Sequence, residues 1–524
     1  MLLARVRQMQ EADRRTIEEI GLPGAVLMEN AAQGAVQVLL EEVEDLAGME
    51  VAAFCGRGNN GGDGLAMARI LVNKGVRARA YLFCRGEDLK GDAALNLAVA
   101  QACGVEVVEV PDQETLDQLV PELTRHQLYL DALLGTGLNS PVRGRYARAI
   151  ELLNSLERPV LAVDVPSGLS ADTGVPLGLA VRARWTATFG LVKLGLMLDS
   201  GEYVGDLFWV DISIPPAVVA DLQINQVLLE DYAAAAFLPP RPPGAHKGSF
   251  GHLVVVGGSP GMSGAPCLAA QAGLRAGAGL VTACLPRDLN PVAEVKLGAV
   301  MSQPLPQTSE GSLSEQALPV LLDLMAGRQA LVLGPGLSRH HQSAELAREL
   351  AARVEAPLVI DADGLNALAG RLEGFGFASS QVVLTPHPGE AARLLGCDTA
   401  AILADRPAAA RELARLSGRV AVLKGARSLI ASPQGDLWVN PTGNVLLASG
   451  GSGDVLSGLI GGLMAQGLDA LTAACAGVYL HGLAADLAAG DYGSRGLAAE
   501  ELVDWLPRAF KQLEDRREPA GSLD

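Results

Sequence analysis

The chain alternates short apolar runs with longer segments whose apolar residues recur at helical spacing. Each run has the length of a β-strand, and polar or glycine-rich residues follow nearly every run. Strands that alternate with helices are typical of parallel α/β folds. The pattern predicts strands within residues 51–55, 78–83, 128–134, 160–165, 252–258, 330–336, 358–364, 382–387 and 420–426. Because parallel sheets bind ligands at the carboxyl ends of their strands, the residues after each run are candidate site residues.

A proline-rich segment separates the two groups of predicted strands. It carries Ile-Pro-Pro at 214–216 and Leu-Pro-Pro-Arg-Pro-Pro-Gly at 238–244, and such proline density disfavours helices and sheet ladders. A chain of 524 residues also exceeds the usual size of one domain. We therefore expect α/β domains at 1–217 and 244–511, a linker at 218–243 and a tail at 512–524.

Composition narrows the possible functions. Hydrophobic residues make up 49% of the chain and charged residues 19%, with a formal charge of −18. An acidic chain without clustered Lys and Arg does not suit nucleic-acid binding. Seven scattered cysteines and an N-terminus without an apolar leader favour a reduced, cytoplasmic protein. The apolar stretch 458–490 contains Asp469 and Asp486, so we expect buried helices there and no membrane span.

The first glycine-rich loop is GRGNNGGDG at 56–64. Gly56, Gly58 and Gly61 have the spacing of a dinucleotide-binding fingerprint, which is a weak signal when it stands alone. Asn59, Asn60 and Asp63 add hydrogen-bonding groups for a ligand or an ion. Alternatively, such residues only form the turn between a strand and a helix.

Two acidic residues end later strands, Asp131 in LYLDALL and Asp164 in VLAVDV. Buried carboxylates need partners, so one could bind an oxygen-liganded cation while the other transfers protons. Lys193 is an unexpected charge in the apolar segment ATFGLVKLGLM and is a candidate partner for such a carboxylate. The alternative is a lysine that snorkels to the surface.

Together, GRGNNGGDG, DALLGTGL, DVPSGLSADTG and TFGLVKLGL resemble the NAD(P)H-hydrate epimerase family over about the first 215 residues. The resemblance implies a Rossmann-like three-layer domain that binds potassium through Asn60, Asp131 and Ser167. The residues implied to contact the hydrated nucleotide are Asn59, Asn60, Gly61, Gly62, Asp63, Gly135, Thr136, Gly137, Leu138, Asn139, Ser140, Pro141 and Asp164. The hydrate carries a hydroxyl on a carbon beside a ring nitrogen, and reversible loss of that hydroxyl scrambles its configuration. We expect Asp164 to be the acid–base catalyst, with Lys193 as a second catalytic residue.

The strongest local signal in the second half is NVLLASGGSGDVLSG at 444–458, where a glycine turn places Asp454 at the start of an apolar helix. Such a turn presents backbone N–H groups to an anion, and Asp454 could take a proton from a hydroxyl that attacks a phosphoryl group. Alternatively, Ser452 or Asp454 only caps the helix. Lys424 ends another predicted strand, and His387 and Glu390 follow a third.

Six ordered motifs, GGSPGMSGAP, LGPGL, DADGLNAL, TPHPGE, LKGARS and GGSGDVLSG, resemble the NAD(P)H-hydrate dehydratase family of the ribokinase-like fold. The family phosphorylates the hydrate with ADP or ATP and magnesium, and phosphate is then eliminated. The residues implied to contact the hydrate are Ala265, Gly336, His387 and Asp454, and those implied to contact the nucleotide are Lys424, Gly425, Ala426, Arg427, Ser428 and Gly453. His387 stands where many vitamin kinases have Asn, which argues against such a kinase.

The sequence thus predicts a bifunctional enzyme that epimerises NAD(P)H hydrate and dehydrates its S form with ADP, yielding AMP and phosphate. We expect it to act as a homo-oligomer, a tetramer or larger. The enzymatic alternative is a small-molecule kinase fused to a nicotinamide-dependent dehydrogenase. A non-catalytic alternative, in which the first half only senses nucleotides or binds proteins, is disfavoured by the presence of Asp131, Asp164 and Lys193 together.

Overall fold

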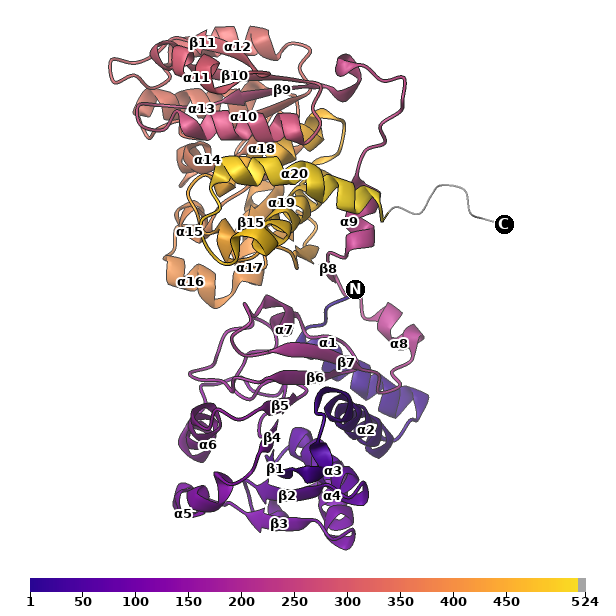
Figure 1. Cartoon of the computed structure of the whole chain (residues 1–524). Coiled ribbons are helices and arrows are strands. Elements are labelled where there is room, and N and C mark those ends of the chain that lie inside the picture. Colours follow the sequence, from indigo (N-terminus) through magenta and orange to yellow (C-terminus); the bar gives the residue numbers. More distant parts are fainter. Residues whose placement is uncertain (517–524) are drawn as a thin grey trace. The chain divides into compact units, whose positions relative to one another are not determined.

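The computed structural model describes residues 1–516, and the chain forms two compact units. The first unit is Leu2–Gln226, and the second begins at Val227 and also includes Met1. Figure 1 shows each unit with its own sheet and its own helices. Each unit is described by itself below.

A seven-stranded, fully parallel sheet forms the centre of the first unit, in the order β3-β2-β1-β4-β5-β6-β7. Its strands are β1 (Glu50–Cys55), β2 (Arg77–Leu82), β3 (Glu106–Glu109), β4 (Leu128–Ala132), β5 (Val160–Val163), β6 (Trp185–Phe189) and β7 (Asp206–Val210). Because all strands run in one direction, their carboxyl ends share one edge.

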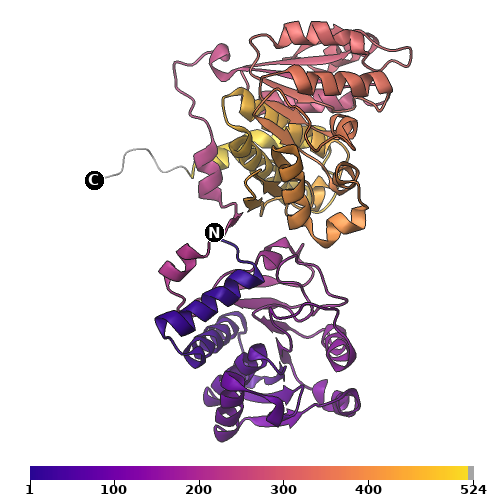
Figure 2. The same cartoon turned by 180° about the vertical axis from the view of Figure 1, so that it is seen from behind.

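Helices cover both faces of this sheet, as Figure 1 and the reverse view in Figure 2 show. The helices are α1 (Val6–Arg15), α2 (Gly24–Glu42), α3 (Asn59–Asn73), α4 (Gly91–Ala102), α5 (Gln113–Leu123), α6 (Gly144–Ser155), α7 (Leu194–Leu198) and α8 (Pro216–Asp221), with short turns η1 (Thr16–Ile20), η2 (Leu46–Gly48) and η3 (Gly86–Asp88). Alternate residues of β1 point to opposite faces of the sheet. Val51 and Ala53 pack in the core with α2, α3 and α4, and Phe54 packs in the core with α5 and α6.

The chain order reverses at β1, because β2 and β3 lie on one side of it and β4 on the other. Ligands bind at such switch points of open α/β sheets. Gly56 follows β1, and a Cβ atom there would lie only 1.9 Å from the carbonyl oxygen of Leu133 after β4. Only glycine therefore lets these two loops approach so closely.

The second unit contains a ten-stranded sheet in the order β11-β10-β9-β12-β13-β14-β15-β16-β17-β8. Its strands are β8 (Gln226–Leu228), β9 (His252–Val256), β10 (Leu280–Pro286), β11 (Met301–Leu305), β12 (Ala330–Leu333), β13 (Leu358–Ile360), β14 (Val382–Leu384), β15 (Val420–Leu423), β16 (Leu429–Ala431) and β17 (Leu437–Val439). The run from β11 to β15 is parallel, and β16 is antiparallel to both of its neighbours.

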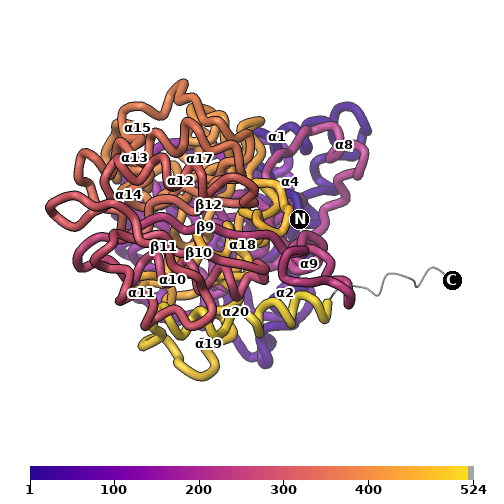
Figure 3. The backbone as a smooth tube through the Cα atoms, turned by 90° about the horizontal axis from the view of Figure 1, so that it is seen from above, coloured from indigo at the N-terminus to yellow at the C-terminus, as the bar shows by residue number. Residues whose placement is uncertain are grey.

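Figure 3 looks down on the second unit, with α10, α11 and α20 on one side of β9 and β10 and α12, α13 and α14 on the other. The helices are α9 (Asp231–Phe237), α10 (Gly264–Arg275), α11 (Asn290–Lys296), α12 (Leu318–Met325), α13 (His341–Arg353), α14 (Ala362–Leu368), α15 (Pro388–Leu395), α16 (Thr399–Ala404), α17 (Arg406–Ser417), α18 (Ser452–Ala465), α19 (Ala470–Tyr492) and α20 (Ala499–Glu514), with short turns η4 (Lys247–Phe250), η5 (Arg287–Leu289), η6 (Glu315–Ala317) and η7 (Val445–Leu447).

One helix of this unit, α19, is long and apolar enough to cross a membrane, but 78% of its most apolar window is buried inside the structure. It packs against α18 and α20 in the main core cluster. The expectation of buried helices in this stretch is confirmed. Apolar length here reflects a core helix.

The second switch point lies between β9 and β12 and repeats the glycine arrangement of the first. A Cβ atom on Gly257 would lie 2.0 Å from the carbonyl oxygen of Pro335. Both units therefore bring two glycine-rich loops together at the carboxyl edge of a parallel sheet. The predicted parallel α/β architecture is confirmed, including a strand within each of the nine predicted runs.

The segment expected as a linker, 218–243, is largely structured. It contains the end of α8, all of β8 and all of α9, and Leu229, Ala234 and Leu238 are buried in the core of the second unit. Its prolines lie beside these elements, so they shape the turns without preventing the helices. At the other end, α20 runs to Glu514 and buries Leu513, so the expected tail begins inside a helix. Residues 517–524 lie outside the described part of the chain.

A fragment that begins at residue 227 should be more stable than one that begins at residue 244. The longer fragment keeps Leu229 and Leu238, which are 1% and 3% exposed, and full burial of such a side chain contributes about 1.5–3 kcal/mol. Urea unfolding of 227–524 and 244–524 compares the two directly. A fragment 219–524 serves as the control and should match 227–524. Equal midpoints for all three would show that β8 and α9 are dispensable.

Two candidate active sites

The first unit holds a cavity of about 650 Å³ at its switch point. Predicted contacts that line it are Asn59, Asn60, Asp63, Gly135, Thr136, Gly137, Leu138, Asn139, Ser140 and Asp164, and Lys193 lines it as well. Gly61, Gly62 and Pro141 were also predicted as contacts but do not line it. A Cβ atom on Gly62 would come within 3.0 Å of Met28 and Ala93. This glycine therefore allows α3 to pack closely against α2 and α4.

Asp164 and Lys193 form the most constrained pair in the cavity. The backbone of Asp164 has a φ of 67°, in the left-handed region that costs a non-glycine residue about 1–3 kcal/mol. The ammonium group of Lys193 donates to the Asp164 carboxylate at 2.5 Å and to the carbonyl oxygen of Phe189 at 2.7 Å. Lys193 is 0% exposed, so the snorkelling alternative is wrong.

Two further carboxyl groups lie in the same cavity. Burial raises the pKa of Asp63 well above its usual value, and the charges of Asp164 and Asp13 add to the effect. Burial also raises the pKa of Asp13 to about 6. Sequence reasoning missed Asp13, because α1 precedes the glycine motifs and reads as a charged surface helix. The available signal was its four-residue spacing from Met9 and Ile17, which also line the cavity.

Asp131 and Ser167 lie together beneath the cavity. Both are 0% exposed, and the Ser167 N–H donates to Asp131 Oδ2 at 2.7 Å. Burial raises the pKa of Asp131 to about 6, against the lowering effect of hydrogen bonds from Ser167 and Leu133. Ser167 Oγ exchanges hydrogen bonds with the backbone of Leu134. The loop that starts at Leu134 thus links this pair to the cavity wall.

The third predicted potassium ligand, Asn60, has an unusual side chain. Its amide oxygen and nitrogen are both buried, and neither has a hydrogen-bond partner among the described residues. Buried polar atoms are nearly always satisfied, so an ion, a water or a ligand is expected beside it. Across residues 1–516, no three His, Cys, Asp or Glu side chains gather to hold a metal. One carboxylate with neutral oxygens fits a monovalent cation.

In the second unit, a buried ion pair lies at the carboxyl edge of the sheet. Lys424, after β15, donates to Asp361 Oδ1 at 2.8 Å and lies 3.9 Å from Glu390 Oε2. Burial lowers the pKa of Lys424, but the charges of Asp361 and Glu390 outweigh it and the net shift is upward. Asp361 belongs to the DADG motif but was not singled out as a site residue. Burial at the end of β13 is what distinguishes it.

Asp454 lies in the first turn of α18, close to this ion pair. A Cβ atom on Gly453 would lie 3.3 Å from Lys424 Nζ. Burial raises the pKa of Asp454 to about 7, with a further contribution from Asp361. The residue that caps α18 is Gly451, with a φ of 93° and no side-chain hydrogen bond. The helix-capping alternative for Ser452 and Asp454 is therefore wrong.

His387 has a structural contact as well as an exposed edge. Its Nδ1 accepts from the Gly389 N–H at 3.0 Å and caps α15, which leaves the proton on Nε2. Burial and the charge of Lys424 lower its pKa, so the ring is neutral at pH 7. Elsewhere at this edge, Gly336 packs against Ala265, since a Cβ atom on Gly336 would lie 3.3 Å from that of Ala265.

The predicted nucleotide loop, Gly425–Ser428, is held by Arg406. The guanidinium group donates to the carbonyl oxygens of Ala426 at 2.6 Å and Arg427 at 2.9 Å. Burial lowers the pKa of Arg406 to about 10, which still leaves it charged at pH 7. The loop geometry therefore depends on a cation that the motif itself does not contain.

Comparisons with known proteins find family matches in both halves of the chain. The NAD(P)H-hydrate dehydratase profile matches residues 253–508, and the profile named YjeF-related protein N-terminus matches residues 24–195. The bifunctional NAD(P)H-hydrate repair enzyme Nnr of Moorella thermoacetica is 43% identical over 520 residues, which covers 99% of this chain and 98% of that protein. The enzyme of the same name from Thermofilum pendens is 38% identical and covers 98% and 97%.

A solved structure is also similar to part of the chain. The ADP/ATP-dependent NAD(P)H-hydrate dehydratase from Bacillus subtilis, co-crystallised with ATP/Mg2+, is 33% identical, and the match covers 56% of this chain and 100% of that one with a TM-score of 0.48.

Two α/β units, each with titratable residues at the carboxyl edge of its parallel strands, are typical of a two-domain enzyme. The relatives that match almost the whole chain then identify its family. The chain belongs to the bifunctional NAD(P)H-hydrate repair enzymes. It joins an NAD(P)H-hydrate epimerase to an NAD(P)H-hydrate dehydratase, each built on parallel α/β strands. The alternative of a kinase fused to a dehydrogenase is not supported.

Replacing Lys424 with Met should destabilise the chain by about 3–5 kcal/mol, because the change strands a buried carboxylate. The Asp361 side chain is only 2% exposed. Adding Asp361→Leu to Lys424→Met should recover much of the loss, as urea unfolding would measure. The control is Arg415→Met, whose pair with Glu412 is exposed and should cost under about 1 kcal/mol. Similar losses for both single variants would contradict a structural role for the buried pair.

Proposed function

We propose that Asp164 is the acid–base group of epimerisation and that Lys193 fixes its position and balances its charge. Reversible loss of the hydroxyl beside the ring nitrogen needs a proton to be given and taken at that oxygen. The observation that supports this role is the buried lysine bonded to a strained carboxylate on the cavity wall. The loops Asn59–Asp63 and Gly135–Pro141 would bind the nucleotide part of the hydrate.

Potassium is proposed to bind through Asn60, Asp131 and Ser167. The unsatisfied amide of Asn60 and the buried carboxylate of Asp131 favour a cation over a structural water. When bound, the ion would supply positive charge beside an anionic nucleotide. The residues themselves would orient the Gly135 loop, since Ser167 holds Leu134.

Epimerisation should depend on potassium. In a bulky organic-cation buffer of equal ionic strength, kcat/KM should fall at least tenfold, because the ligands would lack their ion. Asp131→Ala should show the same low rate in both buffers and dehydrate normally. Asp45→Ala, on a surface loop of the same unit, is the control. Equal parent rates in the two buffers, with Asp131→Ala fully active, would remove the case for a functional ion.

For dehydration, Asp454 is proposed as the base that deprotonates the hydrate hydroxyl. The hydroxyl oxygen then attacks the terminal phosphoryl group of ADP, and AMP leaves. Loss of the new phosphate, with a ring proton, restores the dihydronicotinamide. The backbone N–H groups at the start of α18 and Lys424 would stabilise the phosphoryl charge. Gly425–Ser428 and Gly453 would contact the nucleotide, while Ala265, Gly336 and His387 would contact the hydrate.

Magnesium would accompany the nucleotide. Glu390 is the candidate to hold it through water, since its carboxyl group lies beside both Lys424 and His387. When bound, magnesium would neutralise phosphate charge. The protein is also expected to act in the cytoplasm as a homo-oligomer, a tetramer or larger.

Dehydration should rise with pH. Asp454 acts as a base only when ionised, and its pKa is raised to about 7, so kcat/KM should increase from pH 6 to 8 and then level off. Asp454→Asn should lose at least a hundredfold in dehydration while epimerisation stays within twofold. The dehydration rate is measured as absorbance of the restored dihydronicotinamide, starting from S hydrate with ADP or ATP. Starting from R hydrate, the same signal reports epimerisation followed by dehydration. If Asp454→Asn dehydrates the S hydrate within a few-fold of the parent rate, Asp454 is not the base.

A further inference from the structure

Helix α1 supplies a wall of the epimerase cavity. Met9, Asp13 and Ile17 recur every four residues and all line the cavity, as expected for one face of a helix. The matched family profile begins at residue 24, so α1 lies outside it. The helix continues into the π-helical turn η1, a feature often found at functional sites.

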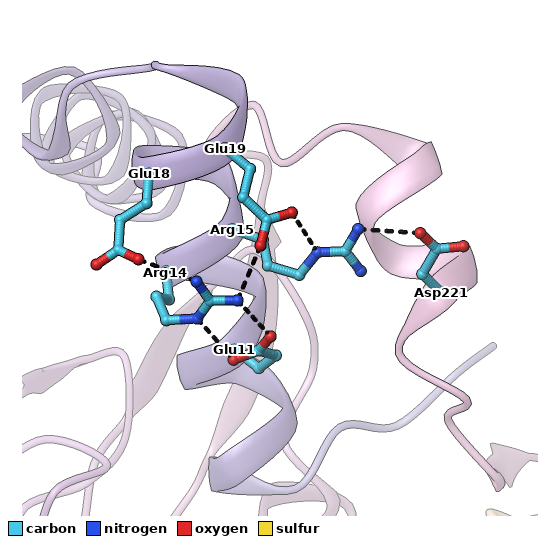
Figure 4. Close-up of polar contacts among 6 residues, drawn as sticks. All are labelled: Glu11, Arg14, Arg15, Glu18, Glu19 and Asp221. Atoms are coloured by element: carbon cyan, nitrogen blue, oxygen red, sulfur yellow. Dashed lines mark hydrogen bonds and ion pairs between the residues drawn. The ribbon is translucent and has the colours of Figure 1, made fainter.

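The opposite face of α1 carries a fully paired charge network, shown in Figure 4. Arg14 bonds to Glu11, Glu18 and Glu19 at 2.8–2.9 Å. Arg15 bonds to Glu19 and to Asp221 of α8, each at 3.0 Å. Exposed pairs of this kind contribute little energy, but together they tie α1 to α8 and fix which face turns inward.

Asp13 is left out of this network. Both adjacent arginines are committed to other carboxylates, and Asp13 makes no hydrogen bond or ion pair with any residue in 1–516. Asp63 on α3 likewise has no partner among those residues, and it is 8% exposed. Asp63 is thus a nine-tenths buried, unpartnered carboxyl group that faces a cavity, and such a group calls for a ligand. Asp13 is partly buried and lies on the α1 wall of the same cavity.

Charge in the cavity is unbalanced. The charged and titratable side chains that line it are Asp13, Arg57, Asp63, Asp92, Tyr146, Asp164 and Lys193. Lys193 is committed to Asp164, and Arg57 is exposed on the loop after β1. Apart from the partly exposed Asp92, three carboxyl groups therefore share one buried ammonium group, which favours a proton on at least one of them. Burial raises the pKa of Asp63 well above its usual value, and it raises the pKa of Asp13 to about 6, which leaves a protonated fraction of Asp13 near neutral pH.

Inversion of a carbon centre needs chemistry on both faces of the ring. The hydroxyl leaves from one face as water, and water returns to the other. A single carboxyl group fixed by a buried lysine serves one face. A second, protonated group on another wall of the cavity would serve the opposite face.

We propose that Asp13 is the acid that protonates the departing hydroxyl, while Asp164 is the base for the returning water; this rests on the role proposed above for Asp164. The proton of Asp13 moves to the hydroxyl oxygen, the C–O bond breaks, and the lone pair of the ring nitrogen forms a C=N bond. Water then adds to the opposite face, Asp164 accepts its proton, and the electron pair returns to nitrogen. After one turnover Asp13 has lost a proton and Asp164 has gained one. Proton exchange with water, or a turnover in the reverse direction, restores both groups.

The test uses the full chain in potassium buffer with R hydrate. Asp13→Asn should lower kcat for epimerisation by about 10²–10⁴-fold, the usual worth of general acid catalysis, with KM changed less than threefold. Asp13→Glu should recover part of kcat. Glu11→Gln, on the paired face of the same helix, is the matched control and should stay within twofold. Dehydration of S hydrate by the same samples should not change.

Several outcomes would overturn the inference. A kcat near the parent value, or a rise in KM alone, in Asp13→Asn would show that Asp13 is not the acid. Asp164→Asn, measured in parallel, separates the two proposals: loss there alone overturns only the role of Asp13, and full activity of both variants removes the role of Asp164 too. If Asp13→Asn does not fold, the pH profile of the parent protein is the test. The parent kcat/KM for epimerisation should fall as pH rises through about 6, because Asp13 then loses its proton. A profile without that fall contradicts the proposal.

Discussion

Each unit contains two neighbouring strands whose following loops touch so closely that only glycine fits between them. Gly56 lies against Leu133 in the first unit, and Gly257 lies against Pro335 in the second. This contact brings the ends of β1 and β4, or of β9 and β12, to one point. In the first unit the polar residues that follow these strands converge there. In the second unit Asp361, Glu390 and Lys424 follow β13, β14 and β15 along the same carboxyl edge. A larger residue at either glycine would separate the loops before it changed any functional group.

Each site also contains a buried lysine surrounded by more carboxyl groups than it can neutralise. Lys193 pairs with Asp164 near Asp13 and Asp63, and Lys424 pairs with Asp361 near Glu390 and Asp454. Burial and mutual repulsion then hold protons on some carboxyl groups at neutral pH. The two units differ in sheet and motif, yet each holds carboxyl groups with raised pKa values beside a buried lysine, an arrangement common at functional sites.

Each of the nine apolar runs contains a strand, but the buried strands β6 and β10 were missed, because threonines interrupt their apolar residues. Edge strands such as β3, β7 and β11 were not predicted, because their half-exposed residues give no continuous apolar signal. Asp131, Asp164 and Asp454 stood out since each follows a run or opens a helix. Asp13 and Asp361 did not, because their importance comes from burial against distant elements, which spacing along the chain does not report.

Backbone hydrogen bonds join residues 1–3 to residues 226–228. The backbone N–H of Leu228 donates to the carbonyl oxygen of Met1, and the Leu3 N–H donates to that of Gln226, each at 2.9 Å. The two ends of the first unit, Leu2 and Gln226, therefore lie side by side. Because its ends already lie together, this unit could be circularly permuted with only a short joining segment.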